Sequence, residues 1–293
     1  MTNDFDIRDG QLKKYLGNDS EVIVPDGIYK IAAGAFRKKN VVKVTLPKGL
    51  TDIGEDAFLS CRELTTVNIP EGVLEIGFQA FRDCIKLSNV KLPGSIELVG
   101  TYAFLGCKSI TEITIPGTNC SICEDAFRSS GLKKITILEG KKDVANRLCY
   151  NCLDLEEVSL PQTIETIGNG AFANCVKLKE IKLPDSIVSI GESAFYMCEN
   201  LGNTKMPASL NFVGNLAFGG TAITEVTVPE GLTKLGKCIF GIKLKKITLP
   251  DTITYIDLDT FTACRELEEI NFSKAQEFMY AMLETPFSRK FNH

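Results

Sequence analysis

Two closely spaced pairs of cysteines are the residues of this chain whose types and spacing could do chemistry. Cys120 and Cys123 form one pair, Cys149 and Cys152 form the other, and together they follow the pattern C-x2-C-x25-C-x2-C. Doubled pairs of this kind hold zinc in small irregular domains, because four thiolates can surround one ion tetrahedrally. One hypothesis for this region is therefore a metal or redox module.

Other catalytic chemistry has little support in the sequence. The single histidine is His293, the last residue of the chain. Most acid–base and nucleophilic mechanisms use a histidine as the proton carrier, and a terminal residue is poorly held. No glycine loop of the phosphate-binding kind is present either. We therefore predict that the protein is not an enzyme and uses no cofactor.

Charge and hydropathy narrow the range of partners. The 293 residues carry a formal net charge of -4, with acidic and basic residues interspersed, which is not the footprint of a nucleic-acid-binding protein. No segment approaches the roughly 20 apolar residues that span a bilayer, so membrane insertion is not expected. Residues 1–10 lack the apolar stretch of a secretory signal, which by itself favours a cytoplasmic location.

The elements that must position these residues repeat along the chain. Ten prolines are each followed by a phenylalanine eleven residues later, and an eleventh unit has Leu138 and Cys149 in these two slots. The pairs are Pro25–Phe36, Pro47–Phe58, Pro70–Phe81, Pro93–Phe104, Pro116–Phe127, Pro161–Phe172, Pro184–Phe195, Pro207–Phe218, Pro229–Phe240 and Pro250–Phe261. Units of 21–23 residues indicate a solenoid of about eleven stacked coils.

One unit shows how a coil is built. Val67 and Ile69 alternate with polar residues, which predicts one short parallel strand per coil. Pro70 ends the strand because proline has no N–H to donate. Gly77 occupies a slot that glycine holds in seven coils, where we expect a turn with positive φ. Phe81 then fills the interior beneath a helical or 3₁₀ turn, and only neighbouring coils can bury these apolar side chains.

The two ends of the stack need covering, because they would otherwise expose the core. Residues 1–22 are expected to form an N-terminal capping hairpin, with Asp9-Gly10 at its turn. Residues 23–272 are the predicted solenoid. Residues 273–293 are expected to form a C-terminal capping helix and tail, since Ser273 and Gln276 make a capping-box pair.

Most of the eleven cysteines follow the repeat. Seven of them lie three residues after the phenylalanine slot, namely Cys61, Cys84, Cys107, Cys152, Cys175, Cys198 and Cys264. The six of these coils that precede another coil have a twelve-residue connection to the next proline slot, whereas the four coils without such a cysteine have ten or eleven residues. Thiols that follow connector length are best explained as buried structural residues. Coils about 4.8 Å apart would also hold neighbouring Cβ atoms too far apart for disulfides.

The repeat frame argues against a metal centre but leaves one region irregular. Cys123 occupies the glycine slot of one coil, while Cys149 and Cys152 occupy the phenylalanine and cysteine slots of the next, so we predict no metal site. In the same two coils Asn119 and Lys141 stand where every other coil has an apolar residue. This region is either a tolerated bend or a specialised ligand-contact patch.

The repeat also resembles a known family. The string I-P-x-x-V-x-x-I-G-x-x-A-F-x-x-C-x-x-L, which runs from Ile69 to Leu87, is similar to the BspA-like (Treponema-type) leucine-rich repeat. The resemblance extends over residues 22–273. It implies a right-handed solenoid with a strand-lined face and a role in adhesion or protein binding, often at a microbial cell surface. That setting contrasts with the cytoplasmic location favoured by the missing signal.

The polar residues of the predicted strands form two columns that are the candidate binding face. Neither column contains an aromatic residue or an arginine, so the columns could serve only to solubilise the sheet. The protein-binding candidates are Glu112, Lys134, Glu157, Glu180, Lys182, Lys205 and Glu225. We predict a monomeric protein-binding or adhesion scaffold with a protein partner. The alternatives are a carbohydrate-binding module and the metal or redox module at Cys120–Cys152.

Overall fold

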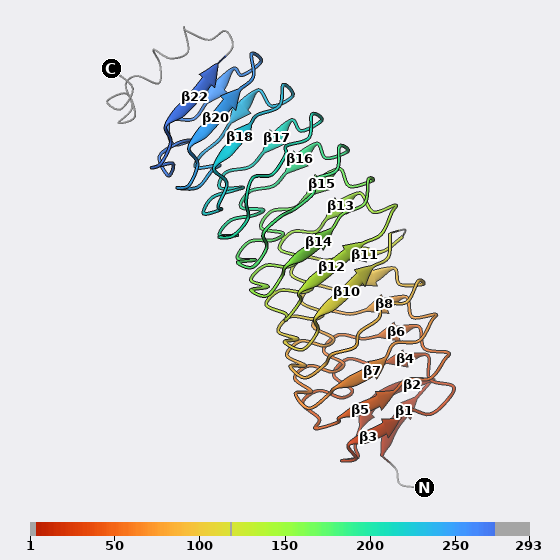
Figure 1. The fold of residues 1–293 in the computed structure, drawn as a ribbon. Coiled ribbons are helices and arrows are strands. Elements are labelled where there is room, and N and C mark those ends of the chain that lie inside the picture. The colour runs from red at the N-terminus through yellow and green to blue at the C-terminus, as the bar shows by residue number, and fades with distance from the viewer. Residues whose placement is uncertain (1–3, 118, 273–293) are drawn as a thin grey trace.

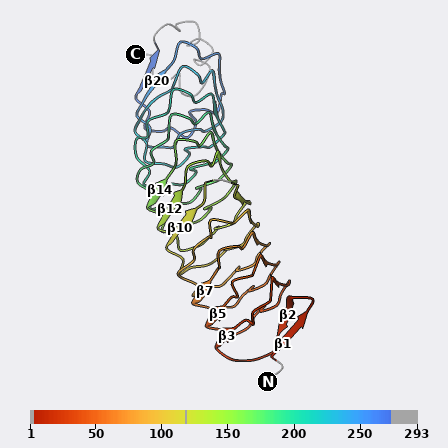
Figure 2. The same cartoon turned by 90° about the vertical axis from the view of Figure 1, so that its right-hand side faces the viewer.

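The computed structural model describes residues 4–117 and 119–272 and confirms the solenoid. The coils stack into an elongated rod, with the N-terminal hairpin at one end (Figure 1; Figure 2). We number the coils 1 to 11 from the one that contains Pro25 to the one that contains Pro250. The predicted C-terminal helix at 273–293 lies outside the described residues. The turns around the phenylalanines are hydrogen-bonded turns, and the described chain contains no helix.

The predicted strands form the first column of the rod, in the expected register. Lys43, Thr66 and their equivalents lie side by side in parallel pairs, as do Glu112, Lys134 and Glu157. The first column consists of β3 (Glu21–Ile23), β5 (Lys43–Thr45), β7 (Thr66–Asn68), β10 (Glu112–Ile115), β12 (Lys134–Ile137), β14 (Glu157–Ser159), β18 (Glu225–Thr227), β20 (Lys246–Leu249) and β22 (Glu269–Phe272).

A second column of strands shows that one strand per coil is an incomplete description. Every coil has a second strand of two residues that includes the apolar residue before the glycine slot, such as Ile76, and this apolar residue is buried in all coils except coil 11. The second column consists of β4 (Lys30–Ile31), β6 (Asp52–Ile53), β8 (Glu75–Ile76), β9 (Leu98–Val99), β11 (Ser121–Ile122), β13 (Asp143–Val144), β15 (Thr166–Ile167), β16 (Ser189–Ile190), β17 (Phe212–Val213), β19 (Lys234–Leu235) and β21 (Tyr255–Ile256).

The hairpin at the N-terminal end joins this second column. β1 (Phe5–Arg8) pairs antiparallel with β2 (Gln11–Tyr15), and the turn between them has positive φ at Asp9 and Gly10. β2 pairs in parallel with β4, so Leu12 lies beside Ile31. The Tyr15 ring stacks on Phe36 at a centroid distance of 5.2 Å. The hairpin therefore places side chains in the slots that a preceding coil would fill.

A stack of phenylalanine rings forms the centre of the core. Adjacent rings are nearly parallel, with centroids 4.8 Å apart between Phe36 and Phe58 and 5.3 Å apart between Phe104 and Phe127. Each of these rings is fully buried. Stacked aromatic pairs contribute about 0.5–1.5 kcal/mol beyond the area they bury. The stack is interrupted at coil 6, where Cys149 stands between Phe127 and Phe172.

The glycine slot has a different cause from the one predicted. Gly77 does not adopt positive φ, so that expectation was wrong. A Cβ atom at Gly77 would lie 2.8 Å from the backbone nitrogen of Glu55, which is closer than real Cβ atoms approach. At Gly77, glycine is therefore required because the adjacent coils touch there. Positive φ falls two residues later instead, at Asp56 (55°) and Gln79 (54°).

The first column is interrupted in three coils. Within the described chain, no strand is assigned at 89–91, 180–182 or 203–205, so this column divides into three separate sheets. These are the three coils with lysine in the second polar column, namely Lys91, Lys182 and Lys205; the other coils have Thr, Ser, Asn or Ile there. Lysine is depleted in strands, and Lys182 and Lys205 place like charges on adjacent coils.

We expect Gly77→Ala to destabilise the protein by about 1–3 kcal/mol, because the added methyl group must push two coils apart. Gly49→Ala is the matched control, since it is exposed, has no positive φ and has no atom within 4 Å of the added methyl group. Urea unfolding followed by circular dichroism measures both variants. If Gly77→Ala and Gly49→Ala unfold at the same urea concentration, the close contact between coils is not the reason for glycine at position 77.

Candidate functional site

The candidate residues chosen from the sequence all lie on the first column, where parallel pairing or a shared coil position aligns them. Six of the seven are exposed, and Lys134 is half-buried. The Nζ atom of Lys134 lies 2.7 Å from Oε1 of Glu157 on the next coil. Glu225 pairs in register with Lys246 on its own separate sheet. The first column therefore presents an aligned row of mostly exposed charged side chains, and some of these charges neutralise one another through ion pairs.

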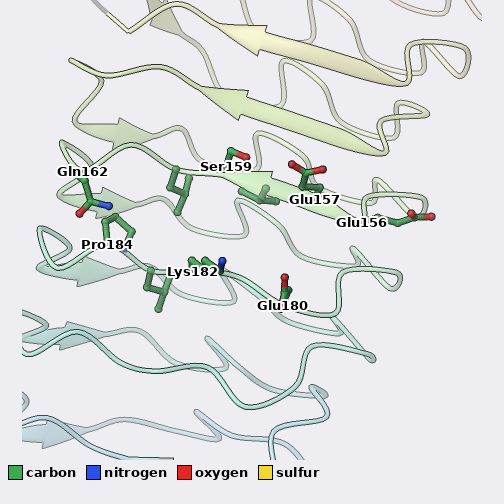
Figure 3. A pocket seen from close by; sticks show the side chains of 10 residues that line it. Glu156, Glu157, Ser159, Gln162, Glu180, Lys182 and Pro184 are labelled. Atoms are coloured by element: carbon green, nitrogen blue, oxygen red, sulfur yellow. The ribbon is translucent and has the colours of Figure 1, made fainter.

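A hollow of about 400 Å³ opens in this face where the first column breaks (Figure 3). It lies between β14 on coil 7 and residues 180–184 on coil 8. Half-buried Leu160 and Leu183 contribute apolar lining. Figure 3 shows Glu157 on one side of the hollow and Glu180 with Lys182 on the other. The structure thus brings three of the seven candidates together, while Glu112, Lys134, Lys205 and Glu225 do not line this hollow.

In the described part of the chain, Glu180 and Lys182 beside the hollow make no ion pair, as is also true of Glu112 and Glu225 elsewhere on the first column. Ion pairs between neighbouring coils are frequent, as between Lys177 and Asp154 (2.7 Å) or Lys246 and Glu269 (3.0 Å). Among the described residues, Glu180, Lys182 and Lys205 make no such pair. Exposed ion pairs contribute at most about 1 kcal/mol, so their loss here costs little stability. Glu180 and Lys182 beside the hollow, and Lys205 one coil further along, are therefore left available to a partner.

The four cysteines of the doubled motif do not form a metal centre in the described part of the chain. Cys120, Cys149 and Cys152 are buried, whereas Cys123 is half-exposed at a turn. No group of three or more potential ligand side chains gathers among residues 4–117 and 119–272. The spacing along the sequence resembles a zinc motif only because two neighbouring coils each contain a pair.

The repeated cysteines have a structural role that the sequence only partly showed. The thiol of Cys61 donates to the carbonyl oxygen of Phe36 at 2.9 Å, and Cys84 donates to Phe58 at 3.1 Å. Each thiol thus bonds a buried carbonyl on the preceding coil. Burial raises the pKa of Cys61 and of Cys264 to about 12, so these thiols stay protonated and unreactive near neutral pH.

The irregular coils 5 and 6 satisfy their own polar groups. Exposed Asn119 adopts a φ of 58°, and Cys120 takes the buried position next to it. The Lys141 ammonium donates to the Cys120 carbonyl oxygen at 2.9 Å and lies 3.4 Å from Asp143. In the same coils, fully buried Asp125 accepts a 2.9 Å hydrogen bond from Arg147. Internal partners therefore occupy these polar groups.

The sequence interpretation missed the exposed aromatic residues of the second column. Tyr29, Phe78, Phe212 and Tyr255 are each between 40% and 54% exposed and lie in or beside second-column strands. A strand of two residues is too short to show alternation of polar and apolar residues, so the local sequence pattern did not indicate that these aromatic side chains are exposed. The available signal was positional, since Phe212 and Tyr255 occupy the same slot of their coils.

Short parallel strands stacked around a phenylalanine core define a leucine-rich-repeat solenoid. The model described as BspA type Leucine rich repeat region matches residues 14–133, 120–242 and 241–283, and the chain belongs to this family. Comparison with curated protein sequences gives no match. Within the described residues, no helix is long and apolar enough to cross a membrane.

Solved structures show the same architecture. A leucine-rich repeat protein from Bacteroides ovatus is 29% identical, with 90% of this chain and 71% of that chain covered and a TM-score of 0.66. The T. pallidum leucine-rich repeat protein is 28% identical over 61% of this chain and 89% of that chain, with a TM-score of 0.56. The pneumococcal vaccine antigen PcpA shares the fold at 22% identity, with 90% and 76% covered and a TM-score of 0.63.

Thiol labelling tests the burial of the cysteines. In the native protein, we expect 5,5′-dithiobis(2-nitrobenzoic acid) to modify only Cys123 and Cys238, because the other nine thiols are buried. In guanidinium chloride all eleven should react. Mass spectrometry counts the modified thiols. Rapid native labelling of the buried Cys84 would contradict its structural role.

Proposed function

We propose that this protein is a non-enzymatic binding scaffold that recognises a protein partner through the first strand column. The surface is centred on the hollow between coils 7 and 8. The observation that carries the proposal is that Glu180 and Lys182 lie unpaired at the hollow, where the strand pairing stops. Positions that break the local rules of a repeat are often kept for function.

The chemistry of the hollow favours a protein segment over a sugar or a nucleic acid. Its lining offers carboxylates, one ammonium group and leucine side chains, which match the mixed side chains of a polypeptide. The residues lining the hollow include no aromatic ring on which a sugar could stack. Nucleic acid would meet the carboxylates of Glu157 and Glu180. Adhesion is the biological role that we propose for such binding.

Charge reversal on coil 8 tests the proposal. The full chain is used to purify its partner, and the affinity of the pair is then measured by biolayer interferometry. We expect the double variant Glu180→Lys/Lys182→Glu to weaken binding about tenfold or more, because complementary charges become opposed. Both side chains are exposed, so folding should be unaffected.

Glu192→Lys is the matched control for that experiment. Glu192 is an exposed glutamate of the same coil that lies after the second-column strand β16, away from the hollow. It should bind like the unmodified chain. If the double variant keeps full affinity, the first column is not the binding face.

A further inference from the structure

Two adjacent coils near the N-terminal end carry apolar side chains on the second column. The Phe78 and Tyr102 rings meet edge to face with centroids 6.0 Å apart. Phe78 is 40% exposed and Leu74 is 39% exposed. Strand pairing between β8 and β9 places half-buried Leu98 beside Glu75. Aromatic and leucine side chains gathered on two neighbouring coils are more than the single exposed apolar residues found on any surface.

Acidic residues lie on the same coils and on the coil before them. Glu55 lies one coil before Phe78 in the same slot, and Glu97 lies one coil after Leu74, bonded to it through the backbone. Glu55, Glu75 and Glu97 are all exposed. We call the four apolar residues Leu74, Phe78, Leu98 and Tyr102, with Glu55, Glu75 and Glu97, the acidic aromatic patch.

The nearby cations do not neutralise the patch. Lys30 pairs with Asp52 at 3.6 Å, Arg37 pairs with Asp56 at 3.1 Å, and Arg82 pairs with Asp83 at 3.5 Å. In the described chain no cation pairs with any of the three patch glutamates. The patch therefore combines uncompensated negative charge with the exposed Phe78 ring and the half-buried Tyr102 ring, and the faces of such rings also attract cations.

We propose that the acidic aromatic patch docks a basic segment of a partner protein. An apolar side chain of that segment packs on Phe78 and Leu74, and its Arg or Lys residues meet Glu55, Glu75 and Glu97. Tyrosine and other aromatic residues are the usual anchors of protein interfaces, and paired charges around an apolar centre add specificity. This surface is distinct from the hollow on the first column, so it is a second contact point on the same rod (Figure 1).

A peptide pair provides the test, using the full chain. The probe is a capped, fluorescently labelled pentapeptide in which three arginines alternate with a leucine and a phenylalanine. The comparison peptide has glutamate in place of each arginine. Fluorescence anisotropy at low salt should show binding of the basic peptide only. Raising the salt concentration should weaken the binding, because exposed charges are screened.

Matched variants separate the patch from the acidic surface in general. We expect Phe78→Ala and Glu75→Lys each to weaken binding of the basic peptide about tenfold. Phe212→Ala removes a ring on coil 9 that is even more exposed than Phe78, and Glu192→Lys reverses an exposed glutamate on coil 8, so both should bind normally. Thermal unfolding of each variant confirms that it remains folded.

Several results would overturn the proposal. These are no binding of the basic peptide up to about 1 mM, equal binding of both peptides, or equal losses in Phe78→Ala and Phe212→Ala. Light scattering provides a further check. If the unmodified chain dimerises and Phe78→Ala is monomeric, the patch docks a second copy of this chain and not a basic segment.

Discussion

A coil of this protein can bury its apolar side chains only against the coils before and after it. The distance between neighbouring coils therefore governs the other features of the rod. Phenylalanine rings stack at 4.8 to 5.3 Å over the first five coils, and the backbones at the same spacing leave no room for a Cβ atom at Gly77. The buried thiols donate hydrogen bonds to carbonyl oxygens of the preceding coil. The spacing between coils therefore explains the repeated glycine, phenylalanine and cysteine together.

The features that repeat at a fixed spacing could be predicted from the sequence. The offset of eleven residues placed the phenylalanine core and the first strand column in correct register, and that column supplied Glu157, Glu180 and Lys182. The hollow between them could not be predicted, because it depends on strand pairing that stops after β14. Ile181-Lys182-Leu183 alternates as well as Val158-Ser159-Leu160 does, yet only the latter segment contributes to a first-column strand. Whether a segment forms a first-column strand therefore depends on its pairing with neighbouring coils and not on its own sequence pattern.

Interruptions in the two columns fall mostly at different places along the rod. The second column breaks between β11 and β13, where the first column runs unbroken through β10, β12 and β14. The first column is missing at 180–182, where β15, β16 and β17 remain paired. At each of these two weak points the other column is therefore continuous, whereas both columns are interrupted between coils 9 and 10. Asn119 has no apolar side chain to place in the core, and Cys149 replaces a phenylalanine ring. At these coils the hydrogen bond from Lys141 to Cys120 and the first-column pairing of β10 with β12 hold the coils together.

The N-terminal hairpin imitates a coil, with Leu12 beside Ile31 and Tyr15 stacked on Phe36. The first junction of the rod is thus of the same kind as those between coils. Whole units of 23 residues, such as the one from Pro70 to Pro93, can then be added or removed without creating a new kind of contact. Each unit changes the separation of the hollow and the acidic aromatic patch by about 5 Å. The number of repeats therefore sets the distance between the two binding surfaces, and evolution or protein engineering can change that distance without changing the residues of either surface.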